Sequence, residues 1–132
     1  MRKILLLMLI VVVIASCTKS SDSPPSISGT YTGTYTRNLG DSSYSSSVTF
    51  VFLSNVFSGS TTGNFPLICP GTFQTTVDSI EFNNPCVLPA NINEAFMLTG
   101  NYKLVVSGDS VTFSRLMGDF IYEEDTYRLK KQ

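Results

Sequence analysis

Residues 29–36 read Gly-Thr-Tyr-Thr-Gly-Thr-Tyr-Thr, a strict alternation with a period of two. This period predicts a β-strand with glycine and tyrosine on one face and threonine on the other. We expect Tyr31 and Tyr35 to point into the core. Glycine inside a strand indicates a bend or a close approach of another backbone, as at the corner of a barrel.

A second pattern predicts a hairpin near the C-terminal end of the chain. In Ser107-Gly108-Asp109-Ser110 the glycine takes the first central position of a two-residue loop, which favours a type II′ turn. This turn sets the register of the flanking strands, with the pairs Val106 and Val111, Leu104 and Phe113, and Tyr102 and Arg115. One face of the hairpin is then apolar and buried, and Arg115 lies on that face.

The remaining segments also favour strands over helices. A strand at 48–53 is apolar on both faces and is expected to be central, while 58–63 reads as a loop or hairpin end. Residues 71–76 and 79–83 predict a hairpin, 84–94 an irregular connection, and 93–97 at most one helical turn. Tyr127 and Leu129 supply apolar positions to a last strand.

This pattern gives seven or eight strands with no helices between them. We therefore predict an all-β fold, an antiparallel up-and-down barrel of about eight strands, with a β-sandwich as the alternative.

The N-terminal segment has the three parts of an export signal. Arg2 and Lys3 precede an apolar run at 4–14, which is shorter than the about 20 residues that a membrane-spanning helix needs. Small residues follow, and the four positions resemble the lipobox of bacterial lipoproteins: Ile14-Ala15-Ser16-Cys17. The resemblance implies that Cys17 becomes the first residue and carries a diacylglycerol on its sulfur and an acyl chain such as palmitate on its amine. The alternative is a plain secretory signal cleaved near a cysteine.

We accordingly divide the chain into a signal peptide at 1–16, a lipidated flexible tether at 17–28 and a barrel domain at 29–132. The tether is polar and contains Pro24-Pro25, a composition that does not form a packed core. Thr18 stands where an Asp would favour retention in the inner membrane, so the lipoprotein resemblance implies the outer membrane. Which face of that membrane the protein occupies stays open.

Acylation of Cys17 leaves Cys69 and Cys86 as a pair in a compartment that permits disulfides. A disulfide across a loop of this length stabilises a domain by roughly 3 kcal/mol. Two buried free thiols are the alternative. We expect no metal site, because the chain has no His and two thiolates do not complete a zinc shell.

Charge and composition narrow the function. The signal holds two of the nine basic residues, which leaves seven against ten acidic residues, a net charge of −3. We expect no nucleic-acid partner from a chain without a basic patch. The absence of His removes Ser-His-Asp and Cys-His catalysis, and we expect neither an enzyme nor a cofactor.

From Gly29 onward the chain resembles the small lipocalin-like lipoproteins of Gram-negative bacteria. The matching stretches are Gly29-Thr30-Tyr31, Gly71-Thr72-Phe73, Ser79-Ile80-Glu81-Phe82, 98–102, 108–113 and Tyr127-Arg128-Leu129. The resemblance implies a calyx-shaped scaffold. Lipocalins have a Trp on the first strand with a late Arg packed over it; here Tyr31 takes the place of the Trp, and Arg128 or Arg115 that of the Arg.

Several inward positions are candidates for lining a ligand pocket. They are Tyr31, Tyr35, Phe50, Tyr102, Phe113 and Arg115. The alternative is a filled core, since an eight-stranded barrel is just wide enough for its own side chains. Arg115 offers a partner for a carboxylate or phosphate, or it stacks on a tyrosine. The acidic run 123–125 lacks the spacing of an EF-hand and reads as a solvated bulge.

We therefore expect a lipid-anchored cell-envelope lipoprotein that works by binding, with a small hydrophobic molecule in the barrel as the first partner class. The alternative is a protein-interaction module, such as an inhibitor or accessory subunit of an envelope complex. In that reading the barrel is filled and the loops 58–63 and 84–93 carry the function.

Overall fold

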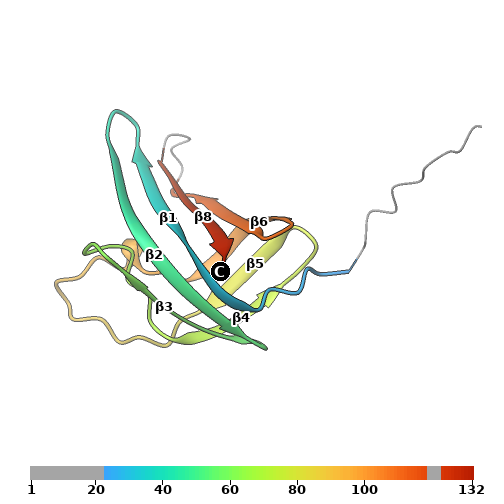
Figure 1. Cartoon of the computed structure of the whole chain (residues 1–132). Helices are drawn as coiled ribbons and strands as arrows, with labels where there is room; N and C mark the ends of the chain where they lie inside the picture. The colour runs from blue at the N-terminus through green and yellow to red at the C-terminus, as the bar shows by residue number, and fades with distance from the viewer. Residues whose placement is uncertain (1–22, 119–122) are drawn as a thin grey trace, which may run out of the picture.

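Eight antiparallel strands follow one another in sequence order and close into a barrel, with β8 paired to β1 (Figure 1). The structure is a computed structural model that describes residues 23–118 and 123–132. The strands are β1 Gly29–Leu39, β2 Ser43–Leu53, β3 Val56–Thr61, β4 Gly71–Thr75, β5 Ser79–Asn83, β6 Gly100–Ser107, β7 Ser110–Leu116 and β8 Glu123–Lys131. One 3-10 turn, η1 Glu94–Phe96, lies between β5 and β6. The predicted all-β up-and-down barrel is confirmed.

The first strand has the predicted faces. Tyr31 and Tyr35 are buried, and the threonines between them face outward or are half-buried. At Gly33 the backbones of β1 and β8 approach so closely that a side chain would collide with the main-chain carbonyl of Arg128. The glycine of the alternating pattern therefore allows the two strands that close the barrel to pair.

The β6–β7 hairpin also has the predicted register. Gly108 has φ 57°, as the first central residue of a type II′ turn requires, and Leu104 pairs with Phe113. Val106 pairs with Val111 but is 37% exposed, because it lies where the barrel wall ends. The ladder stops at Lys103, so Tyr102 and Arg115 meet through their side chains instead.

Two predictions about β2 and β3 are wrong. Residues 58–61 belong to strand β3, and the chain reverses earlier, at Ser54-Asn55, where Ser54 takes a positive φ of 56° without a glycine. The strand expected to be buried on both faces exposes Val51 and Leu53. The hydrophobic outer face of β2 is exposed at the protein surface, because no described residue covers it.

Other local predictions are confirmed. β4 and β5 form the expected hairpin, with Ile80 and Phe82 buried, and η1 is the single helical turn expected at 93–97. Cys69 and Cys86 are joined by a disulfide with a Cα–Cα distance of 6.1 Å. In the part of the chain that the structure describes, no helix is long and apolar enough to cross a membrane.

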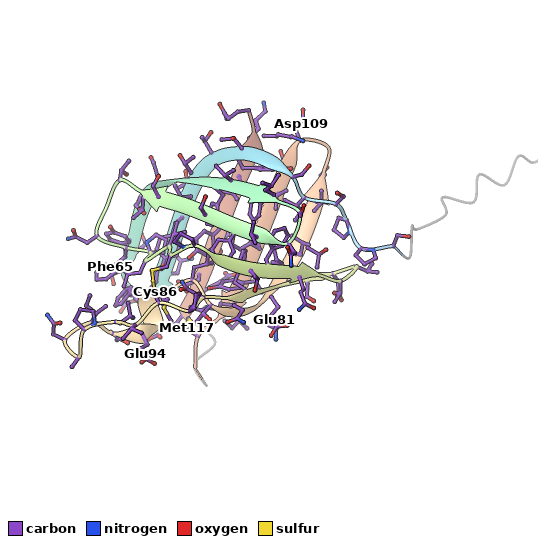
Figure 2. All side chains as sticks on the ribbon, turned by 90° about the horizontal axis from the view of Figure 1, so that it is seen from below. Phe65, Glu81, Cys86, Glu94, Asp109 and Met117 are labelled. Atoms are coloured by element: carbon purple, nitrogen blue, oxygen red, sulfur yellow. A yellow bond between two sulfur atoms is a disulfide. The ribbon has the colours of Figure 1, made fainter. Side chains whose placement is uncertain are left out.

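The barrel has two ends that differ in their connections. At the tether end lie the N-terminal segment 23–28, the turns 54–55, 76–78 and 108–109, and Gln132. At the loop end lie the connections 40–42, 62–70 and 84–99. Figure 2 shows Phe65, Cys86 and Glu94 near one another and Asp109 at the opposite end.

The N-terminal segment covers the tether end. Ile27 is 4% exposed within the core, and the Thr75 hydroxyl donates a hydrogen bond to the Pro25 carbonyl. The folded unit therefore includes at least Ile27, two residues before the predicted start of the domain at Gly29. Of the predicted tether, the structure describes only the part from Ser23 onward.

Candidate functional site

The six residues predicted to line a ligand pocket all lie on the inner side of the barrel wall. Tyr31, Tyr35, Phe50, Tyr102 and Phe113 are each at most 5% exposed, and Arg115 is half-buried at the loop end. The structure therefore brings the predicted set together.

The aromatic members of this set contact one another and their neighbours. The Phe113 ring lies 5.6 Å from that of Tyr102, 5.9 Å from that of Phe50 and 4.5 Å from that of Tyr127 between centroids. Tyr31 packs edge-on against Phe52 at 5.7 Å. Distances of this kind are those of packed aromatic pairs in protein cores. The rings occupy the interior, and their role as ligand contacts stays a prediction.

A buried charged cluster lies above these rings at the loop end. Asp125 on β8 is 1% exposed and accepts two hydrogen bonds from Arg37, from Nε at 2.6 Å and from Nη2 at 2.7 Å. The Tyr35 hydroxyl donates to the same carboxylate at 2.8 Å, and Arg115 Nε donates at 3.3 Å. One carboxylate thus holds two guanidinium groups and a phenol.

Two arginines and one aspartate leave one positive charge in excess. Main-chain carbonyl oxygens of residues 95–99 stabilise it by accepting hydrogen bonds from the two guanidinium groups. Arg115 donates to the carbonyls of Thr99 at 2.6 Å and Met97 at 3.2 Å, and Arg37 donates to that of Ala95 at 2.5 Å. The Arg37 guanidinium also lies 4.2 Å from the centroid of the Phe96 ring. The two cations therefore fix residues 95–99 across the loop end of the barrel.

Burial and charge together shift the titration of this cluster. Burial disfavours the charged form of Arg37, but the Asp125 carboxylate more than offsets it, so the pKa of Arg37 is raised. Burial, followed by the Asp125 charge, raises the pKa of Tyr35 well above its usual value. Burial likewise raises the pKa of Tyr102 and Tyr127. All three tyrosines are therefore protonated at neutral pH.

The Tyr102 hydroxyl is the exception in this otherwise bonded cluster. It is buried and has no hydrogen-bond partner among the described residues, although the Arg115 guanidinium lies 4.7 Å from the centre of its ring. A buried polar group without a partner costs about 1–3 kcal/mol. The ring, rather than the hydroxyl, therefore provides the favourable contact of Tyr102.

The connection 84–99 is irregular, and the rest of the fold holds it near both of its ends. The disulfide ties it at Cys86, and the Asn84 side chain donates to the Leu98 carbonyl and accepts from the Cys86 amide. Main-chain bonds join it to Leu67, which donates to Phe96 and accepts from Leu98. Long connections of this kind without regular structure are commonly functional.

Several grooves lie on the outer wall. One, of about 710 Å³, follows the outer side of β6 and β7 near Lys103, Leu116 and Glu124. Another, of about 490 Å³, is apolar and lies beside the β2–β3 turn, with Leu53 and Val56 among its lining residues.

Sequence reasoning missed two members of the charged cluster. Arg37 continues the inward period of Tyr31 and Tyr35, and Asp125 shares the parity of Tyr127 and Leu129, so both inner-face positions were readable from the pattern. The prediction that 123–125 forms a solvated bulge is wrong for Asp125, which lies in a regular strand and is buried because it neutralises Arg37.

The cation expected over Tyr31 also differs from the prediction. Arg128 faces outward and Arg115 lies over Tyr102, whereas Lys131 Nζ is 6.0 Å from the Tyr31 ring centroid.

The described residues contain no group of three His, Cys, Asp or Glu side chains arranged to hold a metal ion. Comparisons with protein-family models, with curated proteins and with solved structures find no match for this chain.

Proposed function

We propose that this chain is a lipid-anchored protein of the bacterial cell envelope, held in the outer membrane by acylated Cys17, and that it acts as a protein-interaction module. The lipobox-like stretch ending at Cys17 supports the anchor. The barrel provides a rigid scaffold, and the loop end provides the binding surface.

The observation that carries this proposal is the connection 84–99, which is fixed near both of its ends. It is irregular, yet it is held by a disulfide, by the Asn84 side chain and by the guanidinium groups of Arg37 and Arg115. A loop that is ordered before binding loses little conformational entropy when a partner docks. Binding residues are found disproportionately on loops that a rigid scaffold positions.

The exposed chemistry of the loop end indicates the kind of partner. Val87 is 95% exposed on the connection 84–99. Acidic side chains surround this end and are wholly or partly accessible: Asp41, Glu94, Glu123 and Glu124. A partner surface with basic side chains around an apolar contact would complement it.

A small hydrophobic ligand inside the barrel is the competing function, and the packing of the interior disfavours it. A ligand there would have to part the Phe113, Tyr102 and Tyr127 rings, which contact one another. Native mass spectrometry of the full acylated chain, extracted gently from its own host, separates the two functions. We expect the mass of the acylated, disulfide-bonded chain alone, and a reproducible extra mass released on denaturation would contradict the proposal.

The anchor has a direct test. Metabolic labelling with a clickable fatty acid should mark the wild-type protein and fail to mark Cys17→Ser. A mark that persists in this variant would overturn acylation at Cys17.

The loop-end surface is tested by photo-crosslinking in cells. A photoreactive amino acid in place of Val87 should give one discrete protein adduct, whereas the same amino acid in place of Thr34, on the exposed outer wall of β1, should not. Glu94→Lys should reduce the Val87 adduct, because it removes an acidic side chain from the surface. Equal adducts from Val87 and Thr34, or no effect of Glu94→Lys, would contradict a binding surface at this end.

A further inference from the structure

Exposed aliphatic side chains are concentrated at the tether end of the barrel. Among residues 23–118 and 123–132, nine large hydrophobic side chains are exposed, and six of them lie at or near this end: Val51, Leu53, Val56, Val77, Val105 and Val106. The other three are Leu39, Val87 and Leu116, toward the loop end. Single exposed hydrophobic residues are ordinary, but a group of them at one end marks an interaction surface.

These six side chains come from different strands and turns around the same rim. Leu53 and Val56 flank the β2–β3 turn, and Leu53 is 67% exposed. Val77 lies in the β4–β5 turn, and Val106 lies just before the β6–β7 turn. The rim therefore presents aliphatic side chains from several sides of the barrel. A flat apolar partner could contact them at the same time.

The charges of the two ends differ. Near the tether end lie the exposed Arg128, Lys130 and Lys131 of β8, against Asp78 and Asp109, a small positive excess. At the loop end the carboxylates at positions 41, 94, 123 and 124 outnumber the one positive charge left over in the cluster of Arg37, Arg115 and Asp125. An anionic surface would therefore attract the tether end and repel the loop end.

The position of the lipid attachment points to the same end. Ile27, which is buried in the tether end, lies ten positions after Cys17, and ten residue steps span at most about 35 Å when fully extended. Pro25, eight positions after Cys17, also lies at this end, where its carbonyl accepts a hydrogen bond from Thr75. An acylated Cys17 would thus keep the aliphatic rim close to the lipid that it is anchored in.

We propose that the aliphatic rim of the tether end rests on the anionic surface of the lipid bilayer, so that the loop end points away from it. This inference rests on the proposed lipid anchor and adds an orientation to it. The acyl chains hold the protein at the membrane, and the valine and leucine side chains of the rim insert at the level of the headgroups. The lysines of the rim pair with lipid phosphates.

The experiment is site-specific photolabelling of the full acylated chain in vesicles of phosphatidylethanolamine and phosphatidylglycerol. A diazirine amino acid replaces Leu53 in one variant and Leu116 in the other, because both leucines are exposed, at 67% and 62%, on opposite halves of the barrel. Lipid adducts are counted by mass spectrometry. We expect the yield at position 53 to exceed that at position 116 by about tenfold, since only an inserted side chain meets acyl chains.

Each outcome separates the two proposals. Equal lipid labelling at positions 53 and 116, or greater labelling at 116, overturns the orientation and leaves the anchor intact. The same mass spectra report acylation of Cys17, and an unacylated Cys17 overturns the anchor and the orientation together. Vesicles of phosphatidylcholine alone should lower the yield at position 53, and an unchanged yield would overturn the part assigned to the lysines.

Discussion

The two ends of the barrel are closed by different kinds of contact. At the tether end a single apolar side chain, Ile27, enters the core. At the loop end Arg37 and Arg115 share the carboxylate of Asp125 and hold residues 95–99 through their carbonyl oxygens.

The two closures differ in how strongly they depend on each side chain. Apolar contacts are not directional, so a smaller side chain at the tether end leaves a cavity but no unpaired charge. The charged cluster depends on every partner, because removing one leaves a buried charge without compensation. We therefore expect substitutions in the charged cluster of the loop end to destabilise the protein more than substitutions at the tether end.

The largest effect is expected from Asp125→Asn. The substitution keeps the shape of the side chain but leaves the buried guanidinium of Arg37 and the half-buried one of Arg115 without a carboxylate, and breaking a buried ion pair in this way costs about 3–5 kcal/mol. Urea unfolding measures the loss in free energy of unfolding. Glu81→Gln, at an exposed carboxylate on β5, is the control and should change stability by less than about 0.5 kcal/mol. A loss below about 1 kcal/mol for Asp125→Asn would show that the stability of the loop end does not depend on this carboxylate.

The next effect is expected from alkaline pH. Because burial raises the pKa of Tyr102 and Tyr127, these phenols stay protonated in the folded state while the unfolded chain ionises above about pH 10. The unfolded state then binds fewer protons than the folded state, so the free energy of unfolding falls as pH rises. The slope is about 1.4 kcal/mol per pH unit for each tyrosine.

Urea midpoints between pH 9 and 11, with tyrosinate absorbance recorded in parallel, measure this slope. Tyr127→Phe should reduce it by about the share of one tyrosine. A midpoint that stays constant across this range would contradict protonated, buried phenols in the folded state.

Local sequence patterns predicted the faces of β1 and the β6–β7 hairpin. The period of two at 29–36 placed Tyr31 and Tyr35 inward, and Gly108 fixed the β6–β7 register. The turn at Ser54 was missed because its positive φ is taken by a serine, which carries no strong turn signal. Strand faces and hairpin turns are determined by residues close together in the sequence. Periodicity and turn chemistry therefore predict most of them.

The loop end was harder to predict because its contacts join distant parts of the chain. Arg37 and Asp125 are 88 residues apart, and they meet only when β8 pairs with β1 to close the barrel. Read locally, Asp125 follows two glutamates and looks solvated. Arg115 was placed on the inner face, but its carbonyl partners on residues 95–99 have no side-chain signature that a sequence reveals.

Truncation at the tether end should cost less than the loss of Asp125. Ile27→Ala removes a buried side chain, and we expect a loss of about 2 kcal/mol, at the low end for such substitutions, because the end of the barrel can relax around it. Val105→Ala, at an exposed position on β6, is the control and should be nearly neutral. If Ile27→Ala destabilises the protein as much as Asp125→Asn, the tether end is as exacting as the loop end.

The smallest effect separates two hydroxyl groups that lie beside the same charged cluster. Tyr35 donates its proton to Asp125, and a hydrogen bond to a charged group contributes about 1.5–3 kcal/mol, so Tyr35→Phe should destabilise the protein. Tyr102→Phe removes a hydroxyl that has no partner in the described chain and keeps the ring under Arg115. We expect this variant to be neutral or slightly more stable in urea unfolding, because the buried oxygen no longer has to give up water. A loss of more than about 1 kcal/mol in Tyr102→Phe would show that its hydroxyl is bonded in solution, and the loop end would then be fully satisfied.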